Sequence, residues 1–210
     1  MSDTGSESGA AGGNANPAEA PRPVVVAIGV SQDGVSALQR VLAPFQESLK
    51  AVVLVVRHTT PTRPSLLPLV LGRVIKLPVK EAVGGEPLEA GVVYVAPSDL
   101  HLTVVDGRAG LSAGPKVSFT RPSVDVLFES VARVCGARAV GVLLSGGGRD
   151  GAAGLASIRR AGGGTIVQDP DEAVSASMPR AALALDGHRV ARIDDIPEAL
   201  RLALAEASRR

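Results

Sequence analysis

Several residue types that would point to a particular class of protein are scarce in this sequence. Of its 210 residues, one is a cysteine, one is a tyrosine and none is a tryptophan. A single thiol, Cys135, excludes an internal disulfide, and its apolar neighbours indicate a small core residue rather than a nucleophile. The 22 basic and 21 acidic residues nearly cancel, and no Lys/Arg block is long enough to follow a phosphate backbone. Nucleic acid is therefore not an expected partner.

Long apolar runs and targeting segments are also missing. No stretch reaches the ~20 apolar residues that a membrane-spanning helix needs, so we expect no membrane insertion. The N-terminus has no basic segment followed by an apolar one, which excludes a signal peptide and makes a cytoplasmic location the expectation. Residues 1–22 contain no large apolar side chain after Met1. We expect them to be a disordered tail in front of one catalytic domain, residues 23–210.

Apolar segments that are present alternate between strand-like and helix-like patterns. Short runs rich in Val, Leu and Ala are typical of strands buried on both faces. Their alternation with amphipathic segments predicts an α/β fold: a doubly wound, mostly parallel sheet with helices on both faces and a small β-hairpin addition. The expected strands are Val24–Gly29, Ala51–Val56, Val92–Ala96, Val140–Leu144 and Gly164–Gln168, the expected helices are Val35–Leu49, Pro64–Val74, Ser123–Cys135, Gly151–Ala161 and Ile193–Ala207, and the hairpin joins Leu102–Val105 to Ala109–Ser112.

Three polar side chains follow three of these strands. Ligands of such sheets bind at the carboxyl ends of the strands, where the sequence places Ser31, His58 and Asp150. A hydroxyl, an imidazole and a carboxylate are the parts of an acyl-transfer site. Each residue also has a simpler interpretation: Ser31 as a helix cap, His58 as a surface residue and Asp150 as the N-cap of the next helix. The other two histidines are weaker candidates, because His101 should lie at the far end of its strand and His188 in a solvated turn.

A glycine-rich segment supports a different hypothesis. Gly146, Gly148 and Gly151 match the dinucleotide-binding pattern between a strand and a helix, and Asp169 ends the following strand. Against it, Asp150 would hold a carboxylate where the helix N-terminus should receive a phosphate. The pattern also occurs late in the chain rather than after the first strand.

Six segments in a fixed order resemble one known family. They are Val26 to Ser31, Arg57-His58, Tyr94 to His101, Arg121 to Phe128, Leu144 to Gly154 and Met178-Pro179-Arg180. The sequence is similar to the CheB-type protein-glutamate methylesterases of bacterial chemotaxis. The resemblance implies that Ser31, His58 and Asp150 form a catalytic triad that hydrolyses methyl esters of receptor glutamates and also deamidates receptor glutamines. It implies no cofactor or metal, chemotaxis receptors as partners, and an oxyanion held by backbone N–H groups near Gln32 and Gly147.

The sequence departs from the family pattern beside the triad. Gln32 and Asp33 follow the serine where the family has a small residue and paired glycines, and Arg149 replaces an asparagine before the aspartate. These changes motivate an alternative, a catalytically impaired CheB-like binding module in a chemosensory pathway. We expect the charges of Asp33 and Arg149 to offset each other in part, as an ion pair. The family also carries an N-terminal receiver domain, for which the 22 residues before this domain leave no room, so we expect the catalytic half alone.

Overall fold

The computed structural model describes residues 23–45, 49–59, 65–185 and 187–210. The predicted tail, residues 1–22, lies outside the described residues. In the part that is described, no helix has both the length and the apolar character that a bilayer crossing requires.

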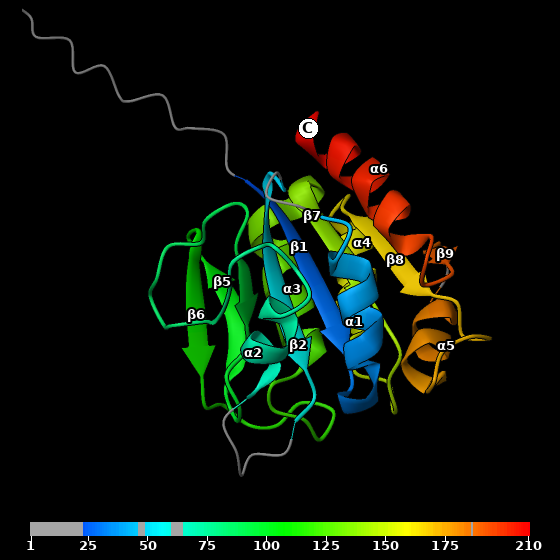
Figure 1. Ribbon diagram of the computed structural model, residues 1–210, viewed down its shortest axis with the longest axis horizontal. Helices are drawn as coiled ribbons and strands as arrows, with labels where there is room; N and C mark the ends of the chain where they lie inside the picture. The colour runs from blue at the N-terminus through cyan, green and yellow to red at the C-terminus, as the bar shows by residue number, and fades with distance from the viewer. Residues whose placement is uncertain (1–22, 46–48, 60–64, 186) are drawn as a thin grey trace, which may run out of the picture.

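A seven-stranded sheet forms the centre of the domain (Figure 1), in the order β3-β4-β2-β1-β7-β8-β9. Every pairing within it is parallel among the described strands. The strands are β1 (Val24–Val30), β2 (Ala51–Arg57), β3 (Val79–Glu81), β4 (Val93–Val95), β7 (Ala139–Leu143), β8 (Gly164–Gln168) and β9 (Arg189–Ala191).

Helices cover both faces of the sheet, as predicted. Successive side chains of β1 point to opposite faces, so that Val26 and Ile28 join one apolar cluster and Val25 and Ala27 the other. The first cluster packs against α1 (Val35–Leu42), α2 (Leu67–Gly72) and α6 (Ile196–Ser208). The second packs against α3 (Val124–Cys135), α4 (Ala152–Arg160) and α5 (Ser177–Leu183). The doubly wound α/β prediction is confirmed.

The predicted hairpin is also present, as β5 (His101–Val105) and β6 (Arg108–Ser112). Asp106 and Gly107 both have positive φ, 47° and 73°, which is the turn that an Asp-Gly pair favours. The hairpin packs on α3, where the Val104 N–H donates to Ser130 Oγ at 3.1 Å.

Several predicted boundaries were wrong. Helix α1 ends at Leu42 rather than Leu49, because Pro44 cannot continue a helix. Helix α2 begins at Leu67 rather than Pro64, and α6 begins at Ile196 rather than Ile193. Strands β3 and β9 have three residues each, too few to show a period, and the seven-residue helix α5 was not predicted either.

The order in which the chain adds strands to the sheet changes direction at β1, and the candidate site lies beside this strand. The chain leaves β1 toward β2 and later returns on the other side as β7. A crevice at the carboxyl ends of the strands is expected at such a switch point. At this point the segments that follow β1 and β7 are joined by a hydrogen bond, which the Ser31 N–H donates to Ser145 O at 3.1 Å. Gly29 allows α3 to approach, because a Cβ there would lie 2.2 Å from Val124 Cγ1.

Candidate active site

Ser31 and His58 leave two neighbouring strands at the same level. In the β1–β2 pairing Val30 lies opposite Arg57, and the His58 N–H donates to Val30 O at 3.0 Å. Ser31 is 8% exposed, and its Oγ makes no hydrogen bond within the described part of the chain. A buried hydroxyl without a partner costs free energy, so Ser31 Oγ is not explained by a structural hydrogen bond. No side-chain cap bond from Ser31 to the following short helix η1 (Gln32–Gly34) is formed, against the simple capping interpretation.

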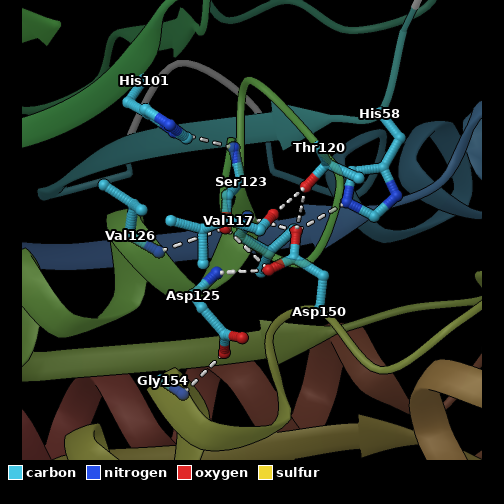
Figure 2. Close-up of polar contacts among 10 residues, drawn as sticks. His58, His101, Val117, Thr120, Ser123, Asp125, Val126, Asp150 and Gly154 are labelled. Atoms are coloured by element: carbon cyan, nitrogen blue, oxygen red, sulfur yellow. Dashed lines mark hydrogen bonds and ion pairs between the residues drawn. The ribbon is translucent and has the colours of Figure 1, made fainter. Parts of the chain in front are cut away.

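The structure joins His58 directly to Asp150. The distance from His58 Nε2 to Asp150 Oδ2 is 2.7 Å, a charge-assisted hydrogen bond (Figure 2). The His58 side chain is 15% exposed and that of Asp150 only 2%. The bond fixes the ring and leaves Nδ1 as the nitrogen that can serve as a base.

Asp150 also binds the N-terminus of α3, a role that the sequence did not predict. Its Oδ1 accepts from Ser123 Oγ at 2.7 Å and from the Asp125 N–H at 3.0 Å. Its Oδ2 accepts from the Val124 N–H at 2.7 Å. The carboxylate therefore satisfies the first free N–H groups of α3 and lies at the positive end of the helix dipole (Figure 2). Its expected role as N-cap of the helix after it is wrong, because the cap residue of α4 is Gly151, which forms no side-chain bond.

These contacts keep Asp150 ionised. Burial by itself raises the pKa of Asp150, but the bonds from His58, the Asp125 N–H and Ser123 lower it by more, and the net pKa lies below its usual value. Asp125 behaves in the opposite way. Burial, together with the neighbouring Asp150 charge, raises the pKa of Asp125 to about 6, although its Oδ1 accepts the Gly154 N–H at 2.8 Å. The aspartate that contacts His58 is thus the one that holds its charge.

Three residues that the sequence analysis did not assign to the site complete the network; Ser123 had been predicted only as the N-cap of α3, which the structure confirms. Ser123 caps α3 and bonds Asp150, and Thr120 Oγ1 donates to Asp150 Oδ2 at 3.0 Å. His101 was expected far from the site, yet its Nδ1 accepts the Ser123 N–H at 3.2 Å, as Figure 2 shows. The antiparallel hairpin turns the first residue of β5 toward α3, which strand direction alone did not indicate. The Ser-x-Asp run at a helix start was the available signal for Ser123.

The glycine loop between β7 and α4 is held by hydrogen bonds to the segment of residues 175–178, at the start of α5. The Gly146 N–H donates to Ser175 O at 2.9 Å, and the Met178 N–H donates to Gly146 O at 2.8 Å. A Cβ on Gly146 would lie 2.0 Å from Met178 Sδ, so close packing explains this glycine. Gly147 is exposed on the loop, and Gln32 begins η1 directly after Ser31. Their backbone N–H groups thus remain the predicted oxyanion donors.

Asp33 and Arg149 do not pair. The predicted ion pair between them is absent from the contacts of the described residues, and the two side chains line separate grooves. His188, expected in solvent, is partly buried, and its Nδ1 lies 2.9 Å from Thr165 Oγ1. Among the described residues, no cluster of three or more His, Cys, Asp or Glu side chains could hold a metal ion.

Comparison with known proteins identifies the family of this site. The family model of the CheB methylesterases matches residues 26–200. The chain belongs to the CheB methylesterase family. A protein-glutamate methylesterase/protein-glutamine glutaminase 2 of Anaeromyxobacter dehalogenans is 45% identical over 189 residues, which cover 90% of this chain and 55% of the relative. The corresponding protein of Symbiobacterium thermophilum is 42% identical, over 89% of this chain and 52% of its own.

A solved structure agrees with this CheB assignment. The crystal structure of the Thermotoga maritima CheB methylesterase catalytic domain superimposes with a TM-score of 0.79 at 29% identity, covering 86% of this chain and 98% of that domain. The chain spans about half the length of the curated relatives it matches. The dinucleotide hypothesis loses its basis, because packing explains two of its glycines: a Cβ on Gly151 would lie 2.7 Å from both Leu143 and Val124.

Proposed function

We propose that this CheB-family chain hydrolyses glutamate methyl esters on methyl-accepting chemotaxis receptors and deamidates receptor glutamines. The observation that carries the proposal is the 2.7 Å bond between His58 and Asp150 at the sheet edge where Ser31 holds a hydroxyl without a partner. Relatives at 40–45% identity are named protein-glutamate methylesterase/protein-glutamine glutaminase. The proposal includes the cytoplasmic location and the absence of a nucleic-acid partner that the sequence predicts.

In the proposed first half-reaction, Ser31 Oγ attacks the ester carbonyl while His58 Nδ1 takes its proton. The C–O bond to the methoxy group breaks, and the proton on His58 passes to the leaving oxygen, which departs as methanol. Asp150 remains ionised throughout and stabilises the imidazolium through its bond to Nε2. Backbone N–H groups of Gln32 and Gly147 receive the developing oxyanion.

Water then completes the cycle. His58 removes a proton from a water molecule, and the water oxygen attacks the acyl-serine carbonyl. The bond from this carbon to Ser31 Oγ breaks, His58 returns the proton to Oγ, and the receptor carboxylate leaves. With a glutamine side chain the same steps release ammonia in place of methanol. The residues that we assign to these steps belong to one chain and require no added group.

Methanol release from methylated receptor by wild type and by Ser31→Ala tests this proposal. We expect release by wild type and a loss on the order of 10⁶ in the variant, as for a triad nucleophile in a well-studied protease. A serine-directed fluorophosphonate should label wild type and not Ser31→Ala. Substantial methanol release by the variant would reject the triad. Receptor binding without methanol release or labelling in wild type would support the binding module instead.

A further inference from the structure

Helices α3 and α4 exchange carboxylates at their N-termini, beside the proposed triad. Asp150, in the loop before α4, accepts the N–H groups of Val124 and Asp125 at the start of α3. Asp125, in the first turn of α3, accepts the Gly154 N–H of α4 at 2.8 Å (Figure 2). Each carboxylate thus satisfies a free N–H at the start of the other helix. The proposed reaction uses Asp150, whereas Asp125 takes no part in its steps.

Helix α4 depends on this contact for its cap. Its own cap residue is Gly151, which has a φ of 95° and no side chain that could accept a hydrogen bond. Gly154 is the third residue of the helix, and its N–H is one that a cap side chain normally accepts. Asp125 Oδ1 accepts this N–H from the neighbouring helix instead. The cap of α4 is therefore supplied by α3.

Close packing of the two helices brings Asp125 within reach of α4. A Cβ on Gly154 would lie 2.6 Å from Phe128 Cβ and 2.9 Å from Asp125 O, so the approach requires glycine at this position. Asp125 is only 8% exposed. A buried carboxyl group costs free energy unless hydrogen bonds offset the loss of solvation, and the Gly154 N–H provides one such bond.

This arrangement bears on the position of Asp150. The carboxylate of Asp150 is bonded to α3, and its main chain enters α4 two residues later. Asp125 connects both ends, because its N–H donates to Asp150 Oδ1 at 3.0 Å and its side chain holds the first turn of α4. Without that side chain the Gly154 N–H loses its acceptor and the turn can shift. A misplacement of about 1 Å in a catalytic group can cost on the order of 100-fold in rate.

The charge of Asp125 acts on the same residues. Burial, together with the neighbouring Asp150 charge, raises the pKa of Asp125 to about 6, so the group is ionised at pH 8 and neutral at pH 5. Arg149 is the other charged residue that lines the groove beside Asp125, and the remaining lining residues are uncharged. An ionised Asp125 therefore adds negative charge next to Asp150, which favours the imidazolium form of His58.

We propose that Asp125 is a positioning residue of the proposed triad, which caps α4 from α3 and so holds Asp150 at bonding distance from His58. Its negative charge also stabilises the imidazolium that forms during the reaction. Asp125 acts through Asp150 rather than on the substrate. This inference rests on the proposed function and adds a residue that sets the geometry of its site.

The test compares Asp125→Ala and Asp125→Asn with two controls. Alanine removes the acceptor of the Gly154 N–H, whereas asparagine keeps an acceptor oxygen and removes only the charge. Glu129→Gln removes an exposed carboxylate one turn later in α3, as the control for charge. Leu200→Ala truncates a buried side chain of α6 on the other face of the sheet, as the control for lost stability. Urea unfolding, and kcat and KM for methanol release from methylated receptor, are measured between pH 5 and pH 9.

We expect kcat of Asp125→Ala to fall at least about tenfold, with KM within about twofold of wild type. Asp125→Asn should keep kcat within about threefold at pH 8, and its kcat/KM should start to decline at a lower pH than in wild type, because the imidazolium loses a neighbouring charge. Both controls should keep the kcat and the pH profile of wild type.

A wild-type kcat in Asp125→Ala, or an equal fall in Leu200→Ala, would overturn the positioning role. A pH profile of Asp125→Asn identical to that of wild type would overturn the role of the charge. Asp125→Asn keeps the cap, so its pH profile remains a test even if the alanine variant does not fold.

Proton NMR separates this inference from the proposed function, because it needs no turnover. A histidine ring N–H bonded to a carboxylate gives a proton signal far downfield, and loss of the signal in His58→Gln assigns it. We expect this signal in wild type, in Asp125→Asn and in both controls, and its loss or broadening in Asp125→Ala. An unchanged signal in Asp125→Ala overturns the positioning role. Absence of methanol release from a wild type that shows the signal rejects the proposed function alone.

Discussion

Asp150→Asn should reduce both stability and activity, whereas Ser31→Ala should reduce activity alone. An asparagine keeps the shape of the side chain, but its NH₂ group cannot accept the hydrogen bonds that one carboxylate oxygen receives. If the amide nitrogen replaces Oδ2, the Val124 N–H at 2.7 Å is left buried against another donor. The two substitutions thus distinguish a residue that only reacts from one that also holds the fold.

The size of the loss follows from these contacts. A buried donor left unsatisfied costs about 1–3 kcal/mol. Removing a negative charge from a partly buried helix N-terminus costs about 1–2 kcal/mol more. Together these terms lower the free energy of unfolding by roughly 2–5 kcal/mol, or the Tm by roughly 4–20 °C for a domain of this size. Ser31 Oγ has no partner among the described residues, so Ser31→Ala should change stability by less than about 1 kcal/mol.

Urea unfolding of the three proteins, together with methanol release, checks this prediction. We expect turnover to fall about 10⁴-fold in Asp150→Asn, the loss seen when the aspartate of a serine-protease triad is made neutral. The reasoning would be refuted by an Asp150→Asn variant as stable as wild type, since the carboxylate would then not hold α3. Equal destabilisation by Ser31→Ala would refute the contrast.

Three further predictions concern the same region. Gly29→Ala should lower the free energy of unfolding by about 1–3 kcal/mol, because the new Cβ would lie 2.2 Å from Val124 Cγ1; an unchanged urea midpoint would contradict this. Asp125→Asn should raise stability at pH 7 by about 1–3 kcal/mol while keeping the bond from the Gly154 N–H. Since the pKa of Asp125 is raised from 3.8 to about 6 on folding, its contribution is full below pH 4 and is lost as the pH rises through 6, so the gain in the variant should vanish in unfolding measured at pH 4. Thr120→Val should lower kcat several-fold by removing one donor to the carboxylate of Asp150, the proposed triad aspartate, and a kcat equal to that of wild type would exclude a positioning role.

The sequence by itself determined the fold class and the places of the site residues along the chain. Apolar strands followed by amphipathic helices specify a doubly wound sheet, because strands buried on both faces need helices on both sides. Ser31, His58 and Asp150 each follow a strand, and parallel strands end at one edge, so the sequence could predict that the three residues lie at the same end of the sheet. The structure shows a direct bond between His58 and Asp150. Short elements such as β3 and β9 were not, since three residues contain too little periodicity.

Only the tertiary structure decided what surrounds Asp150. Thr120 and Ser123 are remote from Asp150 in sequence yet bond its carboxylate, and His101 in turn accepts the Ser123 N–H. These contacts form because the β5–β6 hairpin packs on α3. The structure also shows that Asp33 and Arg149, which the sequence places beside Ser31 and Asp150, lie in separate grooves. Hydrogen bonds and ion pairs depend on distances of a few ångströms between side chains, and those distances are set by packing between elements rather than by the order of residues.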